Sequence, residues 1–242
     1  MDFAVEKLAR DAVESVQAPE WNLRETAGRL VEISGSRAPA SLTIAFRLVW
    51  DAQRQGEPVG WVMSQESFFY PPDVAQGGVD LQSLVVVRVP ESRAISRAGE
   101  KLLRSGAFGL IVLDIGVADI PTPLQSRLAG LARQHHAALL CLTAKEHSHF
   151  SLGSLVSLRV HAGRVRASEN QPISNTGFAS PCSTKGESCR FSPLETPSVL
   201  CPPQEAGFTL NQFACELKVL KDKRRGPTWS ETEMCHGPAG LC

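Results

Sequence analysis

The sequence has no excess of charge and no long apolar run. Its 25 Lys and Arg residues balance 25 Asp and Glu residues, so no overall charge attracts the chain to nucleic acid or to a membrane surface. No stretch reaches the roughly 18 consecutive apolar residues that a transmembrane helix requires. The first residues also lack the basic and apolar segments of a secretory signal. We therefore expect a cytoplasmic protein with no membrane partner.

Metal-binding and catalytic motifs are missing as well. The seven cysteines are odd in number and none forms a C-x-x-C pair, which argues against a disulfide framework and against a zinc ribbon. No G-x-S-x-G elbow or other nucleophile motif is present. We expect reduced thiols, no metal site and no catalytic residue.

A regular alternation of apolar runs and helical patterns is present instead. Such continuous runs are typical of strands buried on both faces of a parallel sheet. The runs are Leu30–Ile33, Val59–Met63, Leu84–Val89, Gly109–Ile115 and Ala138–Thr143. Helical patterns at 41–55, 92–105 and 123–136 separate them. The sequence therefore predicts an α/β fold with a mainly parallel twisted sheet flanked by helices.

The two ends of the chain differ from this central part, which we place at 21–167. Residues 1–20 form an amphipathic pattern that predicts an N-terminal helix. Residues 155–167 alternate around Ala162-Gly163, which predicts an antiparallel hairpin. Residues 168–206 are rich in Pro, Ser and Cys without any period, and we expect a flexible insert. Two strands within 207–242 should then pair with the hairpin and complete the core.

A degenerate phosphate-binding loop follows the first apolar run. The working consensus is G-x-x-x-x-G-K-[ST], between a strand and a helix. Gly35 matches the first glycine, but Ala40, Ser41 and Leu42 stand where the second glycine, the lysine and the hydroxyl residue belong. The lysine neutralises phosphate charge and the hydroxyl binds Mg²⁺. We expect an inert turn and no cofactor, with weak nucleotide binding as the alternative.

These segments, in this order, resemble the RecA recombinase family. The similarity rests on Arg-Leu-Val-Glu-Ile-Ser-Gly (29–35), Gly-Val-Asp-Leu-Gln-Ser-Leu (78–84) and 104–114, which ends in a Walker B type aspartate, Asp114. It resumes at 217–227, where the resemblance implies that Lys221 and Lys223 match lysines that reach a neighbouring subunit's nucleotide. The two segments that hold single-stranded DNA in the recombinase have no counterpart, because only 116–122 and 144–153 stand in their places. Asp114 is then a remnant without a Mg²⁺ site opposite it.

Loss of both the ATP and the DNA elements resembles the ImuA branch of this family, the accessory proteins of SOS mutagenesis. The resemblance implies a non-catalytic adaptor in error-prone translesion synthesis. Its partners would be an ImuB-type inactive relative of Y-family polymerases, a DnaE-type error-prone polymerase and RecA itself, whose recombination it would restrain. Two alternatives remain: a SulA-like inhibitor that binds the division GTPase, and a residual ATPase.

Two basic clusters are the candidate contact sites for partners or DNA. Spacings of four, four and three residues place one cluster on a single helix face: Arg93, Arg97, Lys101 and Arg104. The other cluster lies in the closing strand: Lys221, Lys223, Arg224 and Arg225. Aromatic residues are not interleaved with the second cluster, so we expect DNA binding to be weak or indirect. A merely solvated helix face is the alternative for the first.

Overall fold

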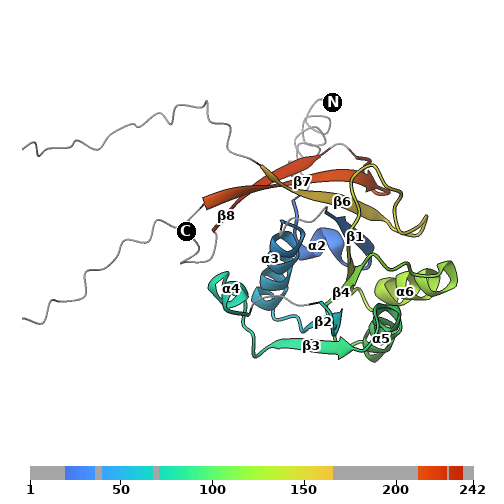
Figure 1. The fold of residues 1–242 in the computed structure, drawn as a ribbon. Coiled ribbons are helices and arrows are strands. Elements are labelled where there is room, and N and C mark those ends of the chain that lie inside the picture. The colour runs from blue at the N-terminus through green and yellow to red at the C-terminus, as the bar shows by residue number, and fades with distance from the viewer. Residues whose placement is uncertain (1–19, 36–39, 68–70, 166–211, 228, 237–242) are drawn as a thin grey trace, which may run out of the picture.

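The described part of the chain forms an eight-stranded sheet with helices on both faces (Figure 1). The computed structural model describes residues 20–35, 40–67, 71–165, 212–227 and 229–236. The strand order is β3-β2-β4-β5-β1-β6-β7-β8. The strands are β1 (Leu30–Ser34), β2 (Val59–Ser64), β3 (Leu84–Val89), β4 (Leu110–Gly116), β5 (Ala138–Thr143), β6 (Leu158–Val165), β7 (Gln212–Asp222) and β8 (Ser230–His236). The helices are α2 (Leu23–Thr26), α3 (Ala40–Arg54), α4 (Pro71–Gln76), α5 (Ser92–Ser105) and α6 (Thr122–Gln134).

Strands β1, β2, β4 and β5 form the parallel centre of the sheet. Every residue of β1, β2 and β5 is buried, as expected for strands covered on both faces. β5 lies between β1 and β4, and β4 in turn pairs with β2, all in parallel. The predicted α/β fold with a mainly parallel sheet is therefore confirmed.

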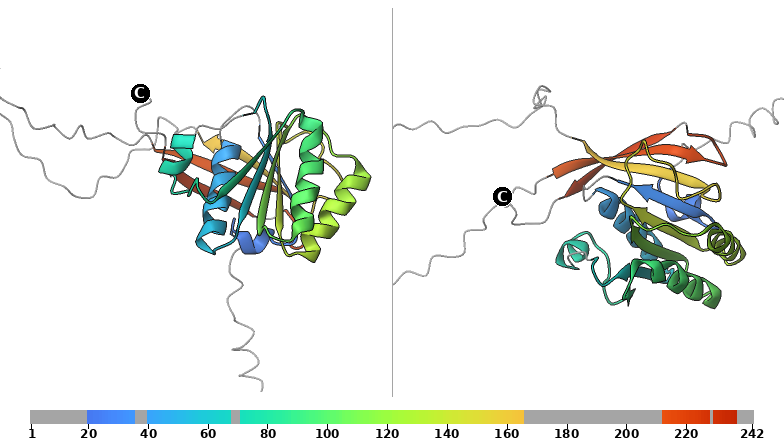
Figure 2. Two further views of the ribbon diagram at one scale, coloured as in Figure 1. Left: turned by 90° about the horizontal axis from the view of Figure 1, so that it is seen from below. Right: turned by 45° about the vertical axis from the view of Figure 1, so that its right-hand side comes forward.

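The helices divide between the two faces of the sheet (Figures 1 and 2). Val31 and Ile33 of β1 belong to the same apolar cluster as α3. Leu30 belongs to a second cluster that contains Leu103 of α5 and Leu128 of α6. Because side chains alternate along a strand, Glu32 and Ser34 face the same side as Leu30. None of the helices in the described ranges has the length and apolar character needed to cross a bilayer.

The prediction that β3 is buried on both faces is wrong. β3 pairs with β2 along one side only and forms an edge of the sheet (Figure 1). Val85 and Val86 are 45% and 40% exposed, whereas Leu84 and Val89 at the strand ends are buried. A run of valines fits an edge strand as well as a central one, so the apolar run identified the strand but not its position.

The predicted hairpin at 155–167 is also wrong. Residues 158–165 form the single strand β6, which pairs in parallel with β1 and antiparallel with β7. Ala162 and Gly163 lie in mid-strand opposite Leu217 and Glu216. Alternation of apolar and polar residues is the same in a hairpin arm and in a continuous strand, and here the antiparallel partner comes from residues 212–222. The prediction that these last strands extend the sheet is confirmed.

A buried ion pair joins the start of β1 to the end of β7. Arg29 Nη2 lies 2.5 Å from Asp222 Oδ1, and both side chains are 2% exposed. Arg29 also donates to the carbonyl and hydroxyl oxygens of Ser157, ahead of β6. Burial alone would raise the pKa of Asp222, but the hydrogen bond from the Arg224 N–H and the bond to Arg29 outweigh it and lower the pKa. The expected helix at 1–20, apart from residue 20, and the insert at 168–206 lie outside the described residues.

Candidate functional site

The turn between β1 and α3 is where the degenerate phosphate loop was predicted. Gly35 follows β1, and its N–H donates to the Thr143 carbonyl of β5 at 3.2 Å. A Cβ on Gly35 would lie 3.3 Å from both Ala162 O and Ser41 Cβ, so β6 and the first turn of α3 close around it. A side chain at this position would therefore press on β6 and on Ser41, which explains why glycine fits here.

The first turn of α3 contributes to the core at the positions where phosphate ligands were expected. Ala40 is 1% exposed and belongs to the cluster between α3 and the sheet. Leu42 is partly buried and packs against the same cluster. Ser41 is half-buried and carries a neutral hydroxyl. An apolar side chain therefore occupies the position where the consensus places the Mg²⁺-binding hydroxyl.

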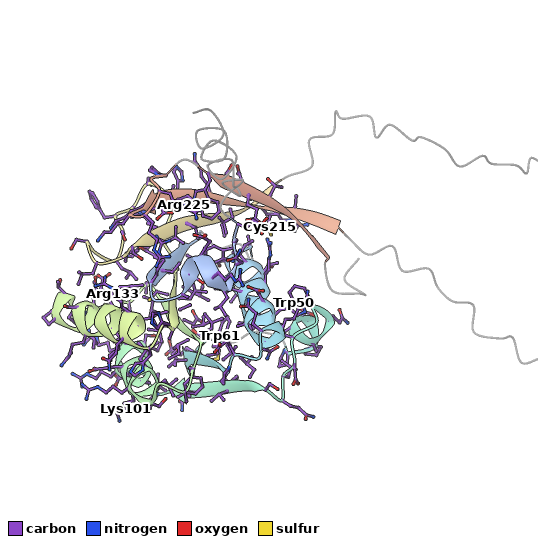
Figure 3. All side chains as sticks on the ribbon, turned by 180° about the vertical axis from the view of Figure 1, so that it is seen from behind. Trp50, Trp61, Lys101, Arg133, Cys215 and Arg225 are labelled. Carbon is purple, nitrogen blue, oxygen red and sulfur yellow. The ribbon has the colours of Figure 1, made fainter. Side chains whose placement is uncertain are left out.

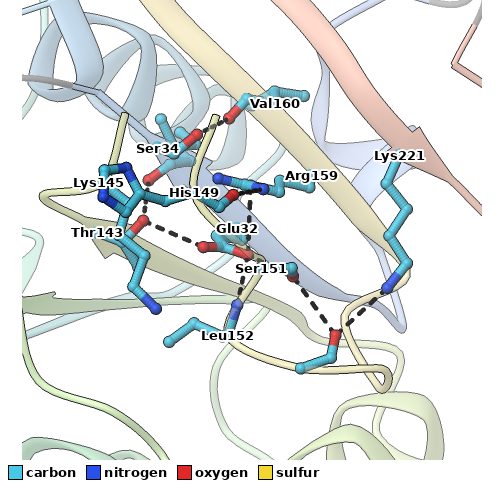
Figure 4. A network of polar contacts seen from close by, with 12 residues as sticks. Glu32, Ser34, Thr143, Lys145, His149, Ser151, Leu152, Arg159, Val160 and Lys221 are labelled. Atoms are coloured by element: carbon cyan, nitrogen blue, oxygen red, sulfur yellow. Dashed lines mark hydrogen bonds and ion pairs between the residues drawn. The ribbon is translucent and has the colours of Figure 1, made fainter. Parts of the chain in front are cut away.

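A buried carboxylate, Glu32, lies in β1, the strand that ends just before Gly35 (Figure 4). Glu32 is fully buried and accepts hydrogen bonds from the Thr143 hydroxyl at 3.2 Å, the Ser151 hydroxyl at 2.6 Å and the Leu152 N–H at 3.0 Å. Arg159 Nε lies 3.7 Å from its Oε2. A buried carboxylate is tolerated when hydrogen bonds and a counter-charge compensate for lost solvation, and here both do so.

Arg159 connects this carboxylate to the segment between β5 and β6. Its guanidinium donates to the backbone carbonyls of His149 at 2.6 Å and Glu146 at 3.3 Å. Together with the bonds from Ser151 and Leu152 to Glu32, these contacts hold residues 144–157 against the sheet. Neither Glu32 nor Arg159 was predicted as a site residue. For Glu32 the available signal was a lone charged residue within the otherwise apolar strand β1.

Asp114 lies at the carboxyl end of β4, where ligands bind in open α/β sheets. Burial raises the pKa of its carboxyl, and a hydrogen bond with the Ser67 side chain partly opposes this effect. Glu66 follows β2 and is exposed at the rim of a shallow hollow of about 280 Å³ beside Arg93. Within the described ranges, no three His, Cys, Asp or Glu side chains are placed to hold one metal ion.

The α5 cluster lies on one exposed face of the helix. Arg93, Arg97, Lys101 and Arg104 are all exposed, as the spacing predicted. Arg104 pairs with Glu100 at 2.8 Å, and Glu100 also lies 3.7 Å from Arg127 of α6. The other three cations form no ion pair with an acidic residue in the described part of the chain, although Arg93 lines one hollow with Glu66 and Glu91. Figure 3 shows Lys101 at the periphery.

The closing-strand cluster is engaged by contacts within the chain. Lys221 and Lys223 donate to carbonyl oxygens of Gly153 and Ser154. Arg224 donates to a carbonyl of the turn after α2, and Arg225 pairs with a carboxylate of α2 at 3.0 Å. Burial, followed by the charge of Lys223, lowers the pKa of Lys221. These residues brace β7 against the rest of the fold, while their role toward partners stays a prediction.

Comparison with known proteins identifies the chain's relatives. Protein RecA of a Nocardioides species is 35% identical over 95 residues, which cover 39% of this chain and 27% of that protein. Protein RecA of Salinispora tropica is 26% identical over 162 residues, covering 66% of this chain and 44% of the relative. The chain is a distant homologue of RecA over part of its length. Protein RecA of Bifidobacterium breve gives 27% identity over 161 residues, covering 66% of this chain and 39% of its own length.

The similarity to RecA therefore covers only part of this chain and only part of each relative. The matched region spans less than half of each of these RecA proteins. No family model matches the chain. The resemblance to RecA predicted from the sequence is supported, whereas assignment to the ImuA branch stays a prediction.

Proposed function

We propose that this RecA-related chain is a non-catalytic adaptor of the DNA-damage response that promotes error-prone translesion synthesis. In this proposal it is a member of the ImuA branch. It binds an ImuB-type polymerase relative, a DnaE-type polymerase and RecA. It neither hydrolyses ATP nor exchanges DNA strands.

The observation that carries the proposal is the packing of α3. A phosphate loop requires a lysine and a hydroxyl at the helix start, where the charge and Mg²⁺ are held. In this chain Ala40 is buried and the partly buried Leu42 packs against the core at that turn. A charge-assisted contact contributes about 1.5–3 kcal/mol, and its loss together with the metal site removes most nucleotide affinity.

The two connections at the carboxyl end of the sheet support the proposal further. β4 ends at Gly116 and α6 begins at Thr122. The segment between β5 and β6 is held against the sheet by hydrogen bonds to Glu32 of β1 and from Arg159 of β6. Lys145 of this segment pairs with Asp119 of the first connection at 3.1 Å. Short, cross-linked connections suit a fixed surface better than a loop that wraps a DNA strand.

Pull-down with purified partners tests the adaptor role. We expect the full chain to retain the ImuB-type protein, the DnaE-type polymerase or RecA, and to ignore the division GTPase. Retention of the division GTPase alone would contradict the proposal and favour the SulA-like alternative. ATP should leave the result unchanged, since the adaptor needs no nucleotide.

A further inference from the structure

Helix α5 carries two adjoining surfaces of different chemistry. One is the cation stripe, which we define as Arg93, Arg97, Lys101 and Arg104. The other is the apolar shoulder between α5 and the edge strand β3. We define the shoulder as Val85, Val87, Ala98, Leu102 and Phe108.

The apolar shoulder forms because β2 contains a glycine next to the sheet edge. Gly60 pairs with Val85, and a Cβ on Gly60 would lie 3.3 Å from Leu102 Cδ1 and 3.4 Å from Phe108 Cδ1. Leu102 and Phe108 therefore lie over Gly60 beside Val85. Val85 is 45% exposed, and the remaining members are partly buried. The shoulder is thus an accessible apolar surface that the described residues leave incompletely covered.

The cation stripe runs along this shoulder. Arg97 and Lys101 directly precede Ala98 and Leu102 in the helix, so each cation lies about 100° around the axis from a shoulder residue. Arg93, Arg97 and Lys101 are exposed and form no ion pair with an acidic residue in the described ranges. Glu66 and Glu91 share a hollow with Arg93, whereas Arg97 and Lys101 do not line it. Arg93, Arg97 and Lys101 follow one another at four-residue spacing, which is about 6 Å along the axis and slightly more than one helical turn.

The surroundings of the stripe favour a protein partner over nucleic acid. The chain carries no net charge and has a sequence pI near 7.0, whereas domains that bind nucleic acid are usually basic overall. An apolar centre with a charged rim is the usual composition of a protein interface, and arginine is enriched there.

We propose that this surface binds an acidic amphipathic helix of a partner protein. Apolar side chains of that helix cover the shoulder, and carboxylates spaced at i, i+4 and i+8 pair with Arg93, Arg97 and Lys101. The inference deepens the adaptor function, on which it rests, by naming the chemistry of one partner. Complementary charge speeds association and selects the partner, while the shoulder supplies apolar burial.

Fluorescence anisotropy with a designed probe tests this proposal. The probe is a labelled helical peptide of about 18 residues, long enough to hold helical structure. It carries Glu at i, i+4 and i+8 and Leu on the adjoining stripe, and a matched peptide has Gln in place of Glu. We expect the full chain to bind the Glu peptide at least about tenfold more tightly than the Gln peptide, and less tightly at high salt.

Variants of the chain assign the binding to this surface. The double variant Arg97→Glu/Lys101→Glu should weaken binding by at least about tenfold, and Val85→Ser by about threefold. The control Arg54→Glu/Lys218→Glu makes the same charge change at exposed positions of α3 and β7 and should bind as the wild type does. Circular dichroism should show that all variants fold, because the charge reversals lie at exposed positions and Val85 is nearly half exposed.

Three results would overturn the proposal. The first is that the charge reversal has no effect: the wild type and both double variants bind the Glu peptide equally, or none of them binds it. The second is tighter binding of double-stranded DNA, lost in Arg97→Glu/Lys101→Glu, which would assign the surface to nucleic acid. The third is self-association that the same variant abolishes, which would assign it to a second copy. Because no polymerase protein is present in this assay, its failure leaves the pull-down result for the adaptor role unaffected.

Discussion

Replacing Glu32 with alanine should lower the free energy of unfolding strongly and loosen residues 144–157 first. The Glu32 and Arg159 side chains are 0% and 7% exposed, so the change leaves a guanidinium buried without its carboxylate. Removing one partner of a buried pair costs about 3–5 kcal/mol. The Thr143 and Ser151 hydroxyls keep second acceptors at 3.4 Å, while the Leu152 N–H loses its acceptor. We expect the free energy of unfolding to fall by about 4 kcal/mol, a large part of the 5–15 kcal/mol typical of a domain.

Urea unfolding followed by tryptophan fluorescence measures this loss, and hydrogen exchange locates it. Exchange should accelerate first in residues 144–157, which Glu32 and Arg159 fix to the sheet. Asp119→Ala is the matched control, because its pair with Lys145 involves a carboxylate that is 79% exposed and should contribute at most about 1 kcal/mol. A loss below about 1 kcal/mol for Glu32→Ala would refute the view that this carboxylate anchors the segment.

Three further predictions follow from other residues. The pKa of Asp222 is lowered, so its ionised form stabilises the fold above pH 3.8, its ordinary pKa, and this stabilisation is lost as pH falls through the pKa of the folded state. Asp222→Asn should therefore lower the free energy of unfolding at pH 7. In urea titrations at a series of pH values, the variant should also lose less stability at acid pH than the wild type does. The pKa of Asp114 is raised, so its protonated carboxyl stabilises the fold below pH 3.8, and this stabilisation is lost as pH rises through the pKa of the folded state. At neutral pH, Asp114→Asn should leave the free energy of unfolding equal to that of the wild type or higher by less than about 1 kcal/mol. A lower free energy of unfolding would contradict the view that Asp114 is a remnant. In thermal melts, Gly99→Ala should destabilise the protein by about 1–3 kcal/mol, because the new Cβ would lie 2.6 Å from Leu113 Cδ2. Gly130 has open space around it within α6, so Gly130→Ala should instead stabilise the protein by about 0.5–1 kcal/mol.

The central strands and the long helices could be predicted because their signals are local. The apolar run 138–143 matches β5, and the pattern at 92–105 matches α5. The short helices α2 and α4 were not predicted, since four and six residues carry too little periodicity. The hairpin error arose because alternation does not reveal which strand is the partner.

The polar contacts of the site could not be predicted from local patterns. Glu32 and Arg159 are far apart in sequence and meet only because β6 pairs with β1 in one register. Arg29 and Asp222 are separated by 193 residues. The closing-strand cations looked like a basic patch, but the fold brings either a carbonyl or a carboxylate oxygen to each of them. The α5 cluster was predicted correctly as one exposed face because its spacing lies within a single helix.

Isothermal titration of the full chain with ATP and Mg²⁺ shows whether the turn between β1 and α3 still binds a nucleotide. We expect no measurable heat of binding, because Leu42 packs against the core and Ser41 offers no charge where a triphosphate would need a lysine and a metal. Saturable binding with micromolar affinity would contradict this expectation.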